Sequence, residues 1–366
     1  MRHAVVLLRT TLAIAAVAVC ATAAADSNVY VVRVGDGAAA LSSAAAAVFL
    51  ERRAADGSIV GVPLALPTAA QPGGSVPFTL SGTASSEGAL ALSADGRSVS
   101  LAGYAVVPGT TSPATSSAAT VNRVVARIDA FGAIDTSTVM TTAFSGGNVR
   151  GAVFANNAFW VSGGSGTGTG TGGVWYVLLG AFNGTQVLNS PGNARTANIV
   201  AGQLYGASGS APFTNVFTIG TGLPTTADVA TSLPGFPTSG ASPYAFVLLD
   251  LNVAVAGVDT AYVADDRALA SGGGIQKWTY DGMTWTEVHV FTNGLSTGVR
   301  GLAAEVQGAN VVLYATTTEA NANTLIRVVD DGSASATVSV IATAPTNTAF
   351  RGVALAPDEI FGNGFE

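Results

Sequence analysis

Six short apolar segments recur along this chain about every fifty residues, and this repeat restricts the fold more than any other sequence feature. Successive segment starts are 63, 45, 49, 56 and 51 residues apart, a mean of 52.8. Such a period is typical of radial arrays in which each repeat is a four-stranded sheet. The repeat therefore predicts an all-β chain that forms a single β-propeller, with each segment as the innermost strand of one blade. The segments are Gly88–Leu92, Gly151–Ala155, Thr196–Val200, Ala245–Leu249, Gly301–Ala304 and Gly352–Ala356.

Further strand-like runs follow most of these segments. Tight turns such as Asp95-Gly96 and Asn156-Asn157 separate the first run of a unit from the second, which predicts hairpins. Third and fourth runs complete most units, and the weakest is the fourth run of the third unit, within 225–233.

The two ends of the repeat complement each other. The sixth segment has no following strands before the sequence stops, whereas three strand-like runs at 28–35, 46–53 and 58–66 precede the first complete unit. These N-terminal strands are expected to complete the last blade and close the ring. This arrangement favours six blades. Seven blades are the alternative if the 63-residue interval hides a degenerate unit, and a β-sandwich or β-solenoid is a further one.

The N-terminus has the pattern of a secretory signal. Arg2, His3 and Arg9 precede an apolar stretch at 10–19, and small residues follow up to Asp26. We therefore expect a signal peptide at 1–25, a propeller at 26–357, a C-terminal tail at 358–366, and a secreted, periplasmic or cell-surface location. No later segment has the roughly 18 uninterrupted apolar residues of a membrane span, and we expect a monomer.

Charge and rare residues exclude several kinds of function. The chain has 15 basic and 22 acidic residues and a net charge of -7, which makes nucleic acid a poor partner. Cys20 falls within the predicted signal, and His289 is the only histidine beyond it. Sites built from several histidines or from cysteines are therefore excluded, and no cofactor is expected except for calcium, which stays open.

One unit carries a more specific pattern. Tyr262-Val-Ala-Asp-Asp266 is followed by Gly274-Ile-Gln-Lys-Trp278 and Asp281-Gly282. This unit resembles the repeats of secreted NHL-like propellers with six or seven blades, whereas the other units match only in their general pattern. The resemblance implies the fold but no particular activity, because propellers serve as binding proteins and as several kinds of enzyme. The closing segment Ile360–Glu366 resembles a short tail found on many secreted proteins of Gram-negative bacteria.

One residue directly before each inner strand forms a candidate ligand-binding ring. Alternating strand directions place these residues on the face that also holds the long loops at 105–120, 163–172, 265–273 and 317–323. Four of the six are arginines, whose planar guanidinium suits a carboxylate, sulfate or phosphate. The alternative is that each arginine binds loop carbonyls or a carboxylate and locks one blade to the next. The ring is Glu87, Arg150, Arg195, Tyr244, Arg300 and Arg351.

Paired carboxylates offer a second kind of site. Asp265-Asp266 and Asp330-Asp331 stand at predicted strand ends, where such pairs can bind calcium or act as acid and base. The more common role of such a pair is a solvated turn. Asp265 and Asp266 are therefore weak metal candidates.

These patterns favour a secreted, non-enzymatic propeller that binds a ligand or protein partner, for example an anionic saccharide, through its long-loop face. One alternative is a propeller hydrolase or lactonase that uses carboxylates and calcium. The other is a structural surface or matrix protein, which would suit the low charge and the loops rich in Ser, Thr and Gly.

Overall fold

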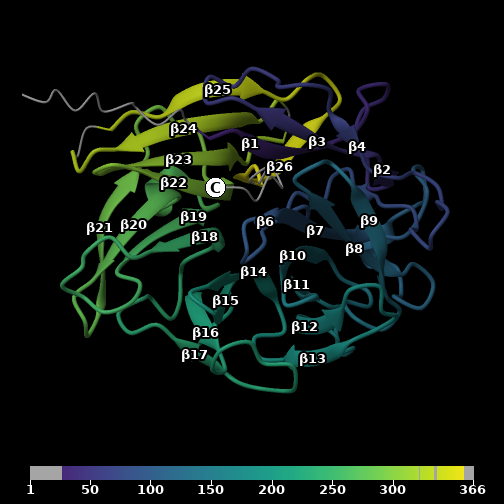
Figure 1. Cartoon of the computed structure of the whole chain (residues 1–366), viewed down its shortest axis with the longest axis horizontal. Coiled ribbons are helices and arrows are strands. Elements are labelled where there is room, and N and C mark those ends of the chain that lie inside the picture. Colours follow the sequence, from purple (N-terminus) through teal and green to yellow (C-terminus); the bar gives the residue numbers. More distant parts are fainter. Residues whose placement is uncertain (1–26, 321, 334–335, 358–366) are drawn as a thin grey trace, which may run out of the picture.

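The computed structural model describes residues 27–320, 322–333 and 336–357. Six four-stranded antiparallel sheets stand in a ring, so the fold is a six-bladed β-propeller (Figure 1). This confirms the predicted fold and shows that the seven-blade alternative is wrong. The 63-residue interval holds a long loop with one short 3-10 helix, η1 (Pro113–Thr115), instead of a further blade.

Each blade runs from an inner strand at the ring centre to an outer strand, and we number the blades along the chain. Blade 1 is β6 (Ala91–Leu92), β7 (Ser98–Tyr104), β8 (Arg123–Asp129) and β9 (Ile134–Met140). Blade 2 is β10 (Val149–Ala155), β11 (Ala158–Gly163), β12 (Gly173–Leu178) and β13 (Thr185–Leu188). Blade 3 is β14 (Ala194–Val200), β15 (Gln203–Ser208), β16 (Asn215–Ile219) and β17 (Ala230–Ser232).

The remaining blades follow the same order. Blade 4 is β18 (Pro243–Leu249), β19 (Thr260–Asp265), β20 (Gly274–Tyr280) and β21 (Trp285–Phe291). Blade 5 is β22 (Val299–Gln307), β23 (Asn310–Thr317), β24 (Thr324–Asp330) and β25 (Ser339–Thr343). Blade 6 is β26 (Ala349–Leu355), β1 (Val29–Val34), β3 (Val48–Arg53) and β4 (Leu64–Ala65). A small extra sheet pairs β2 (Ala45–Ala46) with β5 (Leu80–Ser81), and η2 (Leu269–Ser271) follows β19.

Strands from both ends of the chain close the ring. Inner strand β26 pairs antiparallel with β1, with Val29 opposite Leu355 and Val31 opposite Val353. This confirms that N-terminal strands complete the last blade. The predicted signal peptide at 1–25 and the predicted tail at 358–366 lie outside the described residues. Neither of the two described helices, each of three residues, could cross a membrane.

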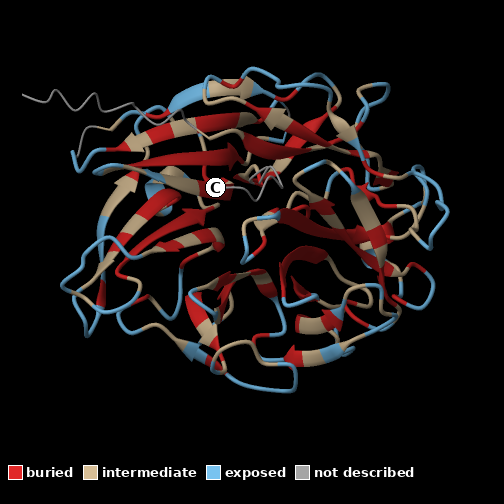
Figure 2. Cartoon of the chain, viewed as in Figure 1, coloured by how far each residue is buried: buried red, intermediate tan, exposed pale blue. Residues whose placement is uncertain are grey.

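The core consists of six clusters of buried apolar side chains, and each cluster fills the interface between two neighbouring blades (Figure 2). Alternation along the strands produces this arrangement, because successive side chains point to opposite faces of a sheet. In β1, Val29 and Val31 pack toward blade 5, whereas Tyr30 and Val32 pack toward blade 1. Both faces of a blade are therefore buried, which explains why many strands are continuously apolar.

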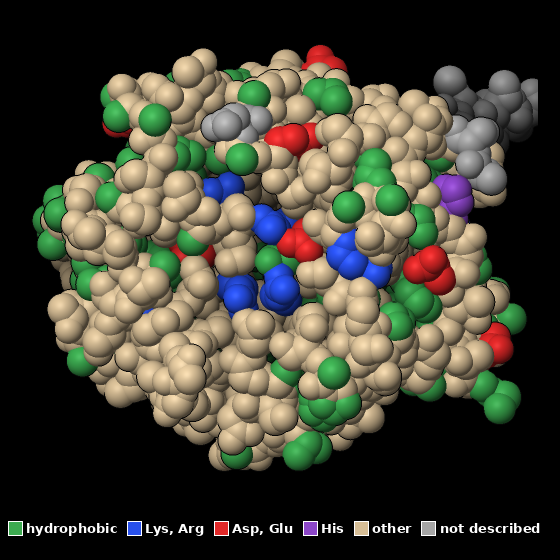
Figure 3. All heavy atoms as spheres, turned by 180° about the vertical axis from the view of Figure 1, so that it is seen from behind, with side chains coloured by type: hydrophobic (Ala, Val, Ile, Leu, Met, Phe, Trp, Pro, Cys, Tyr) green, Lys and Arg blue, Asp and Glu red, His purple; other side chains and the backbone are tan. Residues whose placement is uncertain are grey.

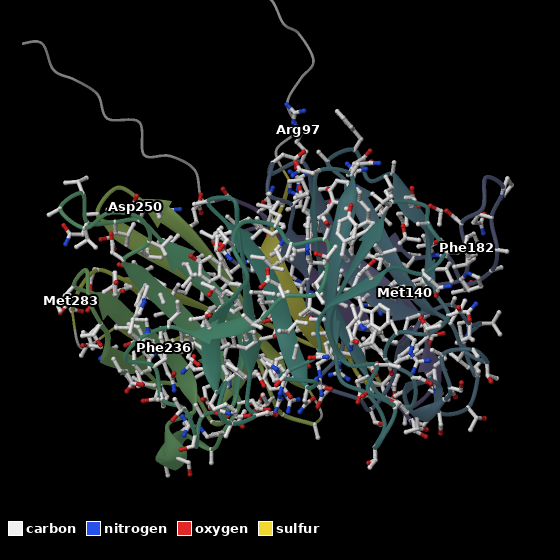
Figure 4. All side chains as sticks on the ribbon, turned by 90° about the horizontal axis from the view of Figure 1, so that it is seen from below. Arg97, Met140, Phe182, Phe236, Asp250 and Met283 are labelled. Carbon is white, nitrogen blue, oxygen red and sulfur yellow. The ribbon has the colours of Figure 1, made fainter. Side chains whose placement is uncertain are left out.

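The predicted long loops lie on the face of the blade links, but the two faces differ less than the sequence predicts. The loops at 163–172 and 317–323 bond to the segments that link one blade to the next, for example Phe144 N to Thr171 O at 2.8 Å and Thr318 N to Gly298 O at 3.2 Å. The opposite face holds tight turns such as Asn156-Asn157, but also ten-residue loops at 54–63, 220–229 and 250–259. Figure 4 shows Arg97 and Asp250 together on this side of the disc. The long loops and the blade links thus share one face.

Candidate functional site

The ring residues stand at irregular positions of the inner strands. Val149 and Gly151 of β10 lie opposite the consecutive residues Gly163 and Ser162 of β11, so Arg150 between them is an extra residue, a β-bulge. The registers of β14, β18, β22 and β26 shift in the same way. A bulge leaves one residue without a cross-strand partner and redirects its side chain. Five bulges therefore coincide with the five ring positions Arg150, Arg195, Tyr244, Arg300 and Arg351.

Four ring residues line a common pocket at the mouth of the central channel: Glu87, Tyr244, Arg300 and Arg351. Figure 3 shows basic side chains gathered around a hollow near the centre of this face, with an acidic side chain among them. The pocket volume is about 30 Å³. The structure thus brings four of the six ring residues together, whereas Arg150 and Arg195 do not line this pocket.

Stacking joins a fifth ring residue to this pocket. The Cζ atom of Arg195 lies 4.3 Å from the centroid of the Tyr244 ring, and the Cζ atom of Arg300 lies 4.9 Å from it. A guanidinium over an aromatic face is attracted to the ring's electron density. Tyr244 therefore orients two arginines from the blades on either side of its own.

Three of the four arginines also connect elements of the fold, as the locking alternative predicts. Arg300 pairs with Asp266 at 2.7 Å and donates to the Ser85 hydroxyl. Arg351 donates to Gly82 O at 3.0 Å, and Arg150 donates to Asn193 Oδ1 at 2.7 Å and Ala194 O at 2.8 Å. The locking alternative therefore describes Arg150, Arg300 and Arg351.

Arg195 is different. Its partly buried guanidinium makes no hydrogen bond or ion pair to any described residue, whereas the terminal nitrogens of Arg150 and Arg351 do. All three arginines have a buried Nε without a partner among the described residues. A buried donor without a partner costs about 1–3 kcal/mol, so its presence calls for an explanation. Locking does not provide one here, because this guanidinium stacks on Tyr244 without a hydrogen bond or ion pair to another described residue.

The arginines also repel one another. Burial, together with a smaller effect of the charge of Arg195, lowers the pKa of Arg150 to about 10. Burial likewise lowers the pKa of Arg351 to about 10, with Arg300 contributing in the same direction and Glu87 opposing it. Arg150 and Arg351 nevertheless remain charged at neutral pH, so a bound anion would relieve the repulsion.

Glu87 is the acidic member of the ring and is almost fully buried. Its Oε1 accepts from Tyr104 OH at 2.5 Å and from Asn148 Nδ2 at 2.7 Å, and its Oε2 accepts from Ser81 N at 2.9 Å. Burial raises the pKa of this carboxyl, although these hydrogen bonds and Arg351 act against the rise. Glu87 therefore positions neighbouring groups below the mouth.

We expect Glu87 to make the protein less stable as the pH rises above 4.5. Its pKa in the folded protein lies above the ordinary value of 4.5, so folding favours the protonated form. That stabilisation is complete below pH 4.5 and is lost as the pH rises through the raised pKa. In urea unfolding from about pH 4 to about pH 8, the unfolding free energy of the wild type should fall relative to that of Glu87→Gln. A difference independent of pH would contradict this assignment.

Behind Glu87 lies a buried arginine that the sequence does not single out. Arg123 is fully buried and donates to four carbonyls, those of Val121, Ser116, Phe144 and Gly147. Its Cζ also lies 5.2 Å from the centroid of the Tyr104 ring. Arg123 thus ties the long loop of blade 1 to the link between blades 1 and 2.

The candidate metal residues lie in ion pairs. Asp265 pairs with Arg267 at 2.8 Å and accepts from Ser242 N at 2.9 Å, and Asp266 pairs with Arg300. Asp265 is fully buried, so the expectation of a solvated turn is wrong for this residue. Among the described residues, no group of three or more His, Cys, Asp or Glu side chains is arranged to hold a metal ion. The calcium hypothesis stays a prediction.

The comparisons add no family to these observations. Neither a protein-family model nor a curated protein matches this sequence, so the resemblance to NHL-like repeats stays a prediction.

Proposed function

We propose that this protein is a binding protein that takes the anionic group of its ligand at the channel mouth. The observation that carries the proposal is Arg195, a guanidinium oriented by Tyr244 and left without a hydrogen-bond partner among the described residues. An oriented guanidinium offers two parallel N–H groups to a carboxylate, sulfate or phosphate. Preorganisation of this kind lowers the entropy lost on binding.

The size of the mouth limits what can enter it. A volume of about 30 Å³ has room for about two water molecules, which matches the two oxygen atoms of one carboxylate group. An acidic saccharide would therefore bind by its charged group, with its ring outside the pocket. The predicted signal peptide at 1–25 supports a location outside the cytoplasm for this binding.

The carboxylates near the mouth favour a binding function over hydrolysis, because they are already engaged in hydrogen bonds or an ion pair. Glu87 accepts three hydrogen bonds, and Asp266 is paired with Arg300. A hydrolase with a carboxylate acid and base needs two such groups that can reach the substrate.

Titration calorimetry with acetate, sulfate and galacturonate at low ionic strength tests the proposal. Arg195→Gln should weaken binding of these anions about tenfold or more, because one charge-assisted hydrogen bond is lost. Arg97→Gln is the matched control, since Arg97 is exposed on the opposite face and should leave the affinity unchanged (Figure 4). If none of the three anions binds the unmodified protein, the proposal fails and the structural alternative gains support.

A further inference from the structure

Below the arginines, the channel widens into a cavity whose walls are mostly aliphatic. Its volume is about 140 Å³, and its lining includes residues of all six inner-strand segments. No charged side chain lines it. The two polar side chains in its wall have partners, because Thr196 Oγ1 donates to Tyr244 O at 2.7 Å and Asn198 Oδ1 accepts from Ile199 N at 2.8 Å.

This cavity is continuous with the arginine mouth. The two share wall residues on five segments, including Leu90, Ala245, Leu302 and Val353. A molecule whose charged group lies in the mouth, beside Tyr244 and Arg300, would therefore extend directly into the aliphatic part. From Arg300 to Ala304 the strand advances by four residue steps, or about 13 Å, which gives the depth of the combined site.

We propose that the ligand is an amphiphilic anion, in which a carboxylate, sulfate or phosphate group at the mouth carries an alkyl or aryl group that fills the channel. This inference rests on the proposed anion-binding function and adds the chemical class of the uncharged part of the ligand. A cavity of about 150 Å³ lined by aliphatic side chains accepts a group the size of benzene, so the apolar part has about six carbon atoms. Small-molecule sites commonly combine an apolar wall with a few convergent polar groups.

The test is a series of straight-chain carboxylates, from acetate through butyrate and hexanoate to octanoate, titrated into the whole protein. Each added methylene should strengthen binding about threefold to fourfold until the channel is full, near hexanoate. Arg195→Gln should weaken binding of every member by a similar factor, because it removes only the contact with the charged group.

A channel-filling variant gives a second measurement. Ala91 lines the cavity but not the mouth, so Ala91→Leu should bring the affinity for hexanoate close to that for acetate and leave acetate binding unchanged. If this variant does not fold, the chain-length series on the unmodified protein still tests whether the alkyl chain occupies the channel.

The outcomes separate the two proposals. Equal affinity for all chain lengths would contradict the proposal of an amphiphilic ligand but not that of an anion site, because the alkyl chain would then not enter the channel. Absence of binding by every carboxylate would overturn both. If affinity rises with chain length but Arg195→Gln does not change it, the channel binds the alkyl chain and the proposed anion site at Arg195 is wrong.

Discussion

Glu51→Gln is expected to lower the unfolding free energy by about 3–5 kcal/mol, because it breaks a buried ion triad in blade 6, the blade that closes the ring. Glu51 Oε1 lies 2.6 Å from Arg33 Nε, and its Oε2 lies 2.5 Å from Arg53 Nη2. All three side chains are largely buried, so removal of the central carboxylate leaves two cations with little access to water. The two guanidinium groups also stack on Phe49 and Phe350 and cannot move away freely.

Urea unfolding at neutral pH measures this effect. Asp250→Asn is a suitable control, because Asp250 is an exposed carboxylate on the turn side of the ring (Figure 4). Its unfolding free energy should stay within about 0.5 kcal/mol of the wild type. If Glu51→Gln also lowers the unfolding free energy by only about 0.5 kcal/mol or less, the triad does not stabilise blade 6.

Arg123→Met is expected to cost about 3 kcal/mol or more. The fully buried guanidinium donates to four carbonyls, and each buried carbonyl that loses its donor costs about 1–3 kcal/mol unless water replaces it. Methionine retains much of the side-chain volume, so the loss reports mainly on the hydrogen bonds. Hydrogen exchange should accelerate in the loop around 113–121 and in the link at 144–147.

A matched control lies on the same strand. Arg127 of β8 is partly exposed and, among the described residues, donates one side-chain hydrogen bond, to Ser98 Oγ at 3.1 Å; its Cζ also lies 4.8 Å from the centroid of the Phe154 ring. Arg127→Met should therefore cost about 1 kcal/mol or less. Equal losses in the two variants would mean that the buried carbonyls do not depend on Arg123.

The repeat alone was sufficient to predict the architecture. Inner strands occur at all six predicted segments because small and β-branched residues recur there at a spacing set by four strands and their turns. The same spacing identified the ring position, although not the bulge, because an extra residue is visible only against its partner strand. The pair β2–β5 and strand β15 (Gln203–Ser208) were not predicted, since their short runs carry too little pattern.

Side-chain partners could not be predicted in the same way. The sequence placed Arg195, Tyr244 and Arg300 at equivalent positions of three blades, but only packing decides that the tyrosine lies between the arginines. Nor did the sequence distinguish Arg123, which is fully buried, from Arg127, which stands four residues later on the same strand. Their environments differ because the loop that holds Ser116 and Val121 and the link that holds Phe144 and Gly147 both fold against Arg123.

The closure of the ring by both chain ends has a consequence for the order of folding. Asn347 Nδ2 donates to Gly37 O at 3.1 Å across 310 residues, so the last blade cannot form until almost the whole chain has been made. Contacts over such separations form slowly, because a long loop must close before they stabilise anything. Until β26 arrives, one edge of β1 has no partner and can pair with other chains. Assembly of the ring is therefore a late step, and the growing chain depends on protection of that edge.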